Sequence, residues 1–258
     1  MKRILSTSLL LLASALPVFS AIKEAPVEYK DGDTVLEGYL VYDDQKAGPH
    51  PGVLVTHQWT GLGDNEKMRA RMLAELGYTA FCADVYGKGI RPVPPEAGKE
   101  AGKYKQNRAL LRQRMNVALD TMKKLPQVDP KHVVAIGYCF GGTAVLELAR
   151  SGADTLGVVS FHGGLDSPTP ADGKKIKSEV LVCHGADDPF VKTDDLAAFK
   201  KEIKDAGVKM HFVAYPGAVH AFTQKGAGSD NSKGAAYNEA ADKKSWEEMK
   251  SFLARLFK

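Results

Sequence analysis

Short apolar runs alternate with amphipathic segments along most of this chain, and this alternation limits the folds that it can adopt. The apolar runs, each bounded by turn residues, cover residues 34–43, 52–57, 78–84, 132–138, 156–162, 179–185 and 209–216. Segments with helical spacing cover residues 65–77, 107–125, 143–152, 194–207 and 243–257. Strands that alternate with helices predict an α/β fold, with a mostly parallel central sheet and helices on both faces. The first run mixes polar and apolar residues in alternation, which predicts a strand at a sheet edge.

The length and composition predict a single domain over residues 21–258. The chain has 258 residues, of which 44% are hydrophobic and 26% charged, the usual balance of a globular protein. No fixed-period repeat or change of composition marks a second domain. Residues 86–105 and 223–244 are rich in glycine, proline or polar residues, and we expect loops there that form pocket walls, lids or plain connections.

Residues 1–20 are predicted to be a signal peptide. Lys2 and Arg3 precede an apolar run over residues 4–19 that is short for a membrane span, and small residues follow at Ser20 and Ala21. We expect cleavage after Ser20 or Ala21, which predicts an exported protein, periplasmic or secreted, with no membrane association after cleavage. A retained N-terminal anchor is the alternative.

The charged residues argue against nucleic acid as a partner. The formal net charge is +4, to which Lys2 and Arg3 of the predicted signal peptide contribute, and no basic block stands apart from the rest. The sequence also lacks a clustered His, Cys or Asp motif with metal-ligand spacing, so we expect neither a metal nor a cofactor.

A cysteine occupies the centre of a glycine-framed turn in the sequence GYCFGG. Gly137 and Gly141 flank Cys139 in a predicted strand-to-helix turn, where side chains at the glycine positions would collide and the central side chain would face solvent. A helix N-terminus there would favour a thiolate, which predicts a nucleophile; a structural turn with a buried thiol is the alternative. Cys82 and Cys183 lie in apolar runs and are predicted to be inert core residues.

A nucleophile of this kind requires a base and an acid that orients the base. Asp187 and Asp188 follow one predicted strand and His220 follows the next, in the chain order nucleophile, acid, histidine. We predict Asp188 as the acid, with a turn or capping role for Asp187, and His220 as the base. Three other histidines are not assigned to this set: His57, His162 and His184.

The three motifs together resemble the dienelactone hydrolase family of α/β-hydrolases over nearly the whole predicted mature chain. GYCFGG resembles the nucleophile turn of that family, GADDPFV its acid loop and GAVHAF its histidine loop. The resemblance implies the α/β-hydrolase fold and a Cys-Asp-His triad made of Cys139, Asp188 and His220.

The resemblance extends to a loop that binds the oxyanion, with one departure. VTHQWTG resembles the family's oxyanion loop, which implies that the N–H groups of Trp59 and Phe140 stabilise the developing negative charge. Family members carry a glutamate one residue before the first donor, where it is held to pair with the resting thiol. This chain has Gln58, whose neutral amide cannot accept the thiol proton, so His220 is predicted to activate Cys139 directly.

A second departure concerns substrate binding. Family members bind the carboxylate of their lactone substrate through arginines, and the matching positions here hold Lys88 and Gln224. Lysine attracts an anion without the two-pronged geometry of a guanidinium, and Arg91 lies near enough in sequence to compensate. A solvated basic loop is the alternative for Lys88 and Arg91.

The sequence therefore predicts an exported hydrolase that cleaves a small ester or lactone through a thioester intermediate. Two alternatives remain open at this stage. One is a non-catalytic small-molecule binding protein on a hydrolase scaffold, which the departure at Gln58 favours. The other is a thiol-redox protein that uses Cys139, although no C-x-x-C motif supplies a resolving thiol.

Overall fold

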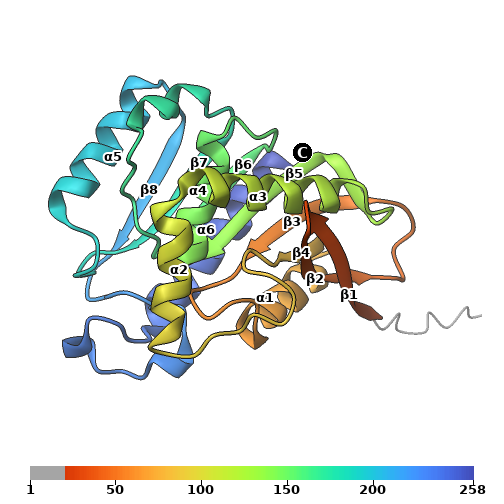
Figure 1. The fold of residues 1–258 in the computed structure, drawn as a ribbon, viewed down its shortest axis with the longest axis horizontal. Helices are drawn as coiled ribbons and strands as arrows, with labels where there is room; N and C mark the ends of the chain where they lie inside the picture. The colour runs from red at the N-terminus through yellow and green to blue at the C-terminus, as the bar shows by residue number, and fades with distance from the viewer. Residues whose placement is uncertain (1–20) are drawn as a thin grey trace, which may run out of the picture.

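The computed structural model describes residues 21–258, whose strands form one eight-stranded sheet (Figure 1). The sheet order is β1-β2-β4-β3-β5-β6-β7-β8. The pairs β1–β2 and β2–β4 are antiparallel, and the five remaining neighbouring pairs are parallel. In chain order the strands are β1 (Ile22–Asp31), β2 (Thr34–Asp43), β3 (His50–Thr56), β4 (Thr79–Ala83), β5 (Val128–Tyr138), β6 (Gly157–Phe161), β7 (Glu179–Gly185) and β8 (Met210–Tyr215). The predicted mostly parallel sheet is confirmed.

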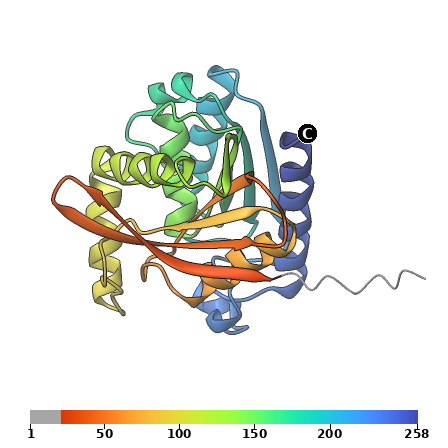
Figure 2. The same ribbon diagram turned by 90° about the vertical axis from the view of Figure 1, so that its right-hand side faces the viewer.

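Helices cover both faces of this sheet (Figure 2). They are α1 (Asp64–Glu75), α2 (Glu96–Gln106), α3 (Arg108–Lys123), α4 (Phe140–Arg150), α5 (Thr193–Asp205) and α6 (Glu239–Leu256), with short 3₁₀ turns at Pro170–Lys175, Lys225–Ala227 and Asn231–Lys233. One buried hydrophobic cluster joins the sheet to α2, α3, α4 and α5, and a second joins the opposite face to α1 and α6. The central strands contribute to both clusters, which explains why their sequences are nearly continuous apolar runs.

The strand at the edge of the sheet is not the one that the sequence predicts. The apolar run at residues 34–43 forms β2, which lies between β1 and β4. The true edge is β1, whose sequence IKEAPVEYKD is largely polar and exposed and therefore carries little hydrophobic signal. Pro26 lies within β1, a position tolerated because an edge strand has one side without a neighbour.

Half of the predicted loop at residues 86–105 is helical. Its second half forms α2, in which Ala97, Ala101 and Tyr104 are buried at helical spacing. Two glycines and the preceding prolines conceal this helix in the sequence, because glycine lowers helix propensity. The second predicted loop, residues 223–244, contains two 3₁₀ turns and the first turn of α6.

The parallel strands bring their carboxyl ends to one edge of the sheet, where the loops after β3, β5, β7 and β8 meet. Within residues 21–258 no helix combines the length and apolarity that crossing a bilayer requires. The predicted signal peptide, residues 1–20, lies outside the described residues.

Candidate active site

Cys139 is the residue between β5 and α4, and its backbone is strained. Its φ of 55° and ψ of −114° are rare for a residue other than glycine. The flanking glycines are required by close packing, because a Cβ at Gly137 would lie 2.0 Å from the carbonyl oxygen of Gly141. A Cβ at Gly141 would lie 2.3 Å from the carbonyl oxygen of Thr56. The chain therefore forms the sharp turn that the sequence predicts.

The structure brings Cys139, His220 and Asp188 together from three loops. His220 Nε2 lies 3.0 Å from the Sγ of Cys139, and His220 Nδ1 lies 2.8 Å from Oδ2 of Asp188. Asp188 is buried, whereas the other two side chains are half-buried and open to a cavity. Asp187 instead accepts a hydrogen bond from the Gly217 N–H at 3.0 Å, the turn role considered for it.

Charges around Cys139 favour its thiolate. Burial alone raises the pKa of the Cys139 thiol, but the hydrogen bond and charge of His220, helped by the charge of Lys105, hold this pKa below its ordinary value. Burial by itself lowers the pKa of His220. The hydrogen bonds to Asp188 and Cys139 outweigh this effect of burial and raise the pKa to about 10. These contacts therefore favour a thiolate beside an imidazolium.

His162 lies against the backbone of Cys139, a contact that the sequence did not predict. The Cys139 backbone N–H donates to the carbonyl oxygen of Phe161 at 3.0 Å and also to Nδ1 of His162 at 3.2 Å, and the Nε2–H of His162 donates to Thr223 Oγ1 at 2.8 Å. This pattern requires a neutral ring, and burial indeed places the pKa of His162 well below its ordinary value. The ring also packs edge-on against His220, with centroids 5.2 Å apart. The feature of the sequence that could have pointed to His162 is its position directly after the strand β6, at the carboxyl end of the sheet.

The proposed oxyanion loop lies beside the thiol and is held by a second buried histidine. Trp59 and Phe140 line the same cavity as Cys139, and within residues 21–258 the Trp59 N–H donates to no protein acceptor. His57 Nδ1–H donates to the carbonyl oxygen of Gln58 at 2.6 Å, and His57 Nε2 accepts the Val85 N–H at 3.1 Å. Both hydrogen bonds fix the backbone just before Trp59.

The Gln58 side chain lines the cavity and is anchored by a buried carboxylate. Its Nε2 donates to Oε1 of Glu66 at 3.3 Å, and the same oxygen accepts Asn65 Nδ2 at 3.2 Å. The second oxygen of Glu66 accepts the Gly63 N–H at 2.9 Å. Burial raises the pKa of the Glu66 carboxyl. The sequence did not reveal this partner, because Glu66 reads as an ordinary residue in the first turn of α1.

The cavity above Cys139 has a volume of about 690 Å³. Its walls come from the oxyanion loop, from α2 and from the loops around the histidine, and many of them are small: Gly98, Ala101, Gly102, Gly164, Ala221, Gly226, Ala227 and Ala235. Gln224 also lines the cavity, and its Nε2 is buried without an acceptor among the described residues. Lys105 lines the same cavity and was missed because α2 was predicted as a loop.

Lys88 and Arg91, predicted to bind substrate, do not line this cavity. Lys88 Nζ lies 2.6 Å from Glu28 and 3.4 Å from Glu37, both of which belong to the first two strands. Arg91 donates to its neighbouring carbonyl oxygens and lies 3.6 Å from Asp84. Both side chains therefore pair with acids outside the cavity lining, and their role in substrate binding stays a prediction.

The other two thiols behave as the sequence predicts. Cys82 and Cys183 are fully buried, and burial raises the pKa of each. Among residues 21–258 no group of three or more His, Cys, Asp or Glu side chains is placed to hold a metal ion.

The sequence matches a family model and several known proteins. The sequence model of the Dienelactone hydrolase family matches residues 36–257. A Saccharolobus solfataricus protein with the provisional name carboxymethylenebutenolidase is 28% identical, across 81% of this chain and 91% of its own length. The protein Usf of Aquifex pyrophilus is 29% identical, across 76% of this chain and 85% of its own length.

Solved structures agree with the sequence comparison. A dienelactone hydrolase-like promiscuous phosphotriesterase from metagenomic libraries is 40% identical and superimposes with a TM-score of 0.89, across 92% of this chain and all of its own. A dienelactone hydrolase homologue from Klebsiella pneumoniae, at 21% identity and a TM-score of 0.77, shares the fold. The chain therefore belongs to the dienelactone hydrolase family and is a carboxylic ester hydrolase with the α/β-hydrolase fold.

Proposed function

We propose that this protein hydrolyses a small ester or lactone with Cys139 as the nucleophile, His220 as the base and Asp188 as the residue that orients His220. The observation that carries this proposal is the line of contacts from thiol to imidazole to carboxylate, at 3.0 and 2.8 Å. Both distances lie within the range over which a general base takes and returns a proton.

In the proposed first step, the Cys139 thiolate attacks the ester carbonyl carbon and the carbonyl π electrons move to oxygen. The N–H groups of Trp59 and Phe140 stabilise that oxyanion. When the tetrahedral intermediate collapses, the C–O bond breaks and the leaving alkoxide takes the proton from the His220 imidazolium. A thioester on Cys139 and a free alcohol result; in a lactone both remain in one molecule.

Water completes the cycle. His220, now neutral, removes a proton from a water molecule that attacks the thioester carbonyl, and Asp188 stabilises the imidazolium that forms. Collapse of the second tetrahedral intermediate breaks the C–S bond. The carboxylic acid leaves, and the thiolate–imidazolium pair is restored.

The direct test compares hydrolysis by the wild type and by Cys139→Ala, with p-nitrophenyl acetate and dihydrocoumarin as ester and lactone probes. We expect the substitution to lower kcat/KM by about 10³-fold or more, because the covalent route is lost. Cys82→Ala is the matched control, since that thiol is buried away from the cavity. Wild-type rates in Cys139→Ala would refute the proposed nucleophile.

A second candidate activity is phosphotriester hydrolysis. The observation that favours it is the 40% identity to a promiscuous phosphotriesterase of the same fold. In this reaction the same thiolate would attack phosphorus and expel an aryl oxide, which His220 would protonate. Release of p-nitrophenol from paraoxon by the wild type, but not by Cys139→Ala, would support it; no release would exclude paraoxon as a substrate.

We also propose that the protein is exported. The support is the sequence of residues 1–20, with a basic start at Lys2 and Arg3 and an apolar run over residues 4–19. Mass spectrometry of the protein expressed in a bacterium with its first residues intact tests this. An N-terminus at Ala21 or Ile22 in the periplasmic fraction is expected, and a full-length cytoplasmic product would contradict it.

A further inference from the structure

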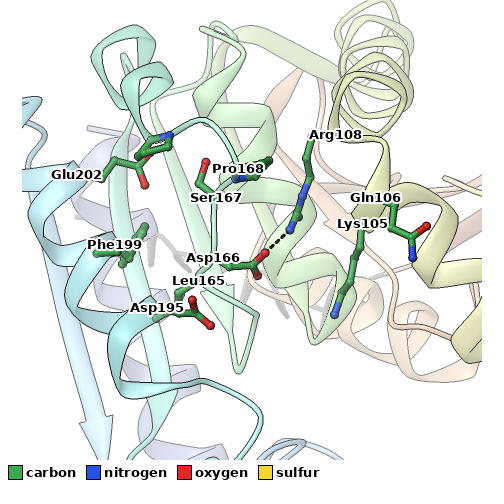
Figure 3. A pocket seen from close by; sticks show the side chains of 12 residues that line it. Lys105, Gln106, Arg108, Leu165, Asp166, Ser167, Pro168, Asp195, Phe199 and Glu202 are labelled. Carbon is green, nitrogen blue, oxygen red and sulfur yellow. Dashed lines mark hydrogen bonds and ion pairs between the residues drawn. The ribbon is translucent and has the colours of Figure 1, made fainter.

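A second cavity of about 440 Å³ adjoins the one above Cys139 (Figure 3). It lies between the end of α2, the start of α3, the loop over residues 165–170 and the helix α5. Lys105 lines both cavities, and Gly164 of the first is followed directly by Leu165 of the second. The two cavities therefore border each other at Lys105.

Arg108 on the wall of this second cavity has donors that the protein leaves unused. Its side chain is 8% exposed, and one nitrogen, Nη2, donates to Oδ2 of Asp166 at 2.6 Å. Nε and Nη1 are buried with no acceptor in residues 21–258. By contrast, Arg150 donates through three nitrogens and Arg114 through two. Buried donors without acceptors are costly, so a ligand that accepts from Arg108 would gain binding energy.

Asp166 is a partner that an incoming group can replace. Its side chain is 50% exposed and lies on a surface loop, so it can turn toward water at little cost. A ligand carboxylate that takes its place has two oxygens for the guanidinium, the geometry that arginine binds best. Arg108 would then use donors that the single bond to Asp166 leaves idle.

The basic side chains of the second cavity lie on one side of it, and one of them, Lys105, also lines the cavity above Cys139. Figure 3 shows Lys105 and Arg108 on the side of α2 and α3, with Asp195 and Glu202 across the space on α5. Both carboxylate oxygens of Glu202 already accept hydrogen bonds from the buried Arg150. Lys105 is exposed and has no ion-pair partner within the described residues, so its charge is available to an anion.

We propose that this cavity is a distal subsite that binds a carboxylate of the substrate, remote from the scissile ester, through Arg108 and Lys105. The substrate class is then an ester or lactone that carries a remote carboxylate, such as a monoester of a dicarboxylic acid. The proposal rests on the function proposed above and adds the second binding point.

The kinetic test uses p-nitrophenyl monoesters of succinate, glutarate, adipate and suberate, each beside the same compound with its free acid methylated. A second series places the carboxylate on the alcohol, as acetate esters of ω-hydroxy acids. The measured quantity is the ratio of kcat/KM for the acid to that for its methyl ester. In the wild type we expect this ratio to rise with chain length in one series and to reach about 10.

Three variants identify the residues responsible. Arg108→Gln is expected to bring the ratio close to 1, and Arg108→Lys to restore part of it. Asp166→Asn is expected to raise the ratio, because it removes the competing carboxylate. Arg114→Gln is the matched control: Arg114 is also a buried arginine of α3, paired with Asp31 at 2.6 Å, but it lines neither cavity. A ratio that does not depend on chain length, or that Arg108→Gln and Asp166→Asn both leave unchanged, would overturn the subsite.

A binding experiment separates this proposal from the proposed hydrolysis. Adipate is titrated by calorimetry into Cys139→Ala and into the same protein with Arg108→Gln. Binding by the first and not by the second supports the subsite, even if no ester is turned over and the proposed function fails. Absence of adipate binding, together with a flat acid-to-methyl-ester ratio, overturns it. If the esters are hydrolysed but those with a remote carboxylate are not preferred, adipate binding through Arg108 would indicate a site for a separate anion and would also overturn it.

Discussion

At the scale of single residues, the neighbours of a thiol decide whether it can react. Cys82 and Cys183 are enclosed by apolar strands, and burial raises the pKa of both. Cys139 is half-buried and opens to the cavity; burial by itself raises its pKa, but His220 reverses that effect. The buried His162 meanwhile holds the Cys139 backbone N–H, so the neighbours fix both the charge and the position of this sulfur.

Gln58→Glu is expected to shift the reactivity of Cys139 toward higher pH. The new carboxylate would lie about where the Gln58 amide now meets Glu66 at 3.3 Å, and two carboxylates this close share a proton. The negative charge of the pair opposes a thiolate. Rates of alkylation by iodoacetamide, measured from pH 5 to 10, should show a raised apparent pKa.

The double variant Gln58→Glu with Glu66→Gln is the control for that measurement. It keeps the new carboxylate and removes the one beside it, so it tests whether sharing of a proton moderates the shift. Superimposable profiles for wild type and Gln58→Glu would show that position 58 does not influence the thiol.

Most of the proposed catalytic set could be predicted, because a nucleophile turn and its partners lie at fixed places in an α/β sheet. Cys139, Asp188 and His220 were found in this way, and the structure places them in contact. Lys105 could not be identified because its helix was predicted as a loop. Arg108 could not be identified because a sequence does not show which basic side chain a distant acid will pair with. Glu28 and Glu37 on other strands draw Lys88 away, and only the fold reveals that pairing.

At the scale of secondary-structure elements, β5, the turn at Cys139 and α4 form a unit set by backbone packing. The extent of burial separates the strands and helices that can be predicted from the sequence from those that cannot. The strands of the parallel sheet are apolar on both faces and stand out in the sequence. The edge strand β1 and the glycine-containing helix α2 each bury only a narrow stripe, so tertiary contacts rather than local pattern determine them.

Replacement of two glycines by alanine is expected to change the free energy of unfolding in opposite directions. Gly141→Ala should lower the free energy of unfolding by about 3 kcal/mol or more, because its Cβ would lie 2.3 Å from the Thr56 carbonyl oxygen. Gly102→Ala should raise it by about 0.5–1 kcal/mol, because a Cβ there meets nothing within 4 Å and alanine favours the helix α2. Urea unfolding of the three proteins at pH 7 measures both. Equal stabilities would contradict the packing described for the turn.

At the scale of the whole molecule, buried neutral histidines couple stability to pH. Burial lowers the pKa of His57 to about 4 and also lowers the pKa of His162 and His184. The unfolded chain takes up these protons near pH 6.5 and the folded chain does not, so their contribution is complete above pH 6.5 and decreases as the pH falls. His220 acts in the opposite sense: its raised pKa keeps it charged in the folded state, so it adds a small opposing slope near pH 6.5 that vanishes as the unfolded chain also becomes protonated.

The free energy of unfolding should therefore fall between pH 6.5 and pH 5, by up to about 1.4 kcal/mol per pH unit for each histidine kept neutral. Urea unfolding at several pH values in this range measures the slope. His162→Asn should reduce it, since one of the protons that only the unfolded chain binds is then absent. A free energy of unfolding that stays constant across this range would show that these rings are not kept neutral by the fold.

In the proposed mechanism, hydrolysis by the whole molecule depends on a covalent intermediate at one sulfur, and rapid acid quenching during turnover detects it most directly. The protein is mixed with p-nitrophenyl butyrate, quenched within the first turnover, digested, and its peptides are weighed by mass spectrometry. We predict an added butyryl group on the peptide that contains Cys139, its loss on treatment with hydroxylamine, and no such group in Cys139→Ala. A butyryl group on another side chain that forms and decays at the rate of turnover, with Cys139 unmodified, would contradict the mechanism.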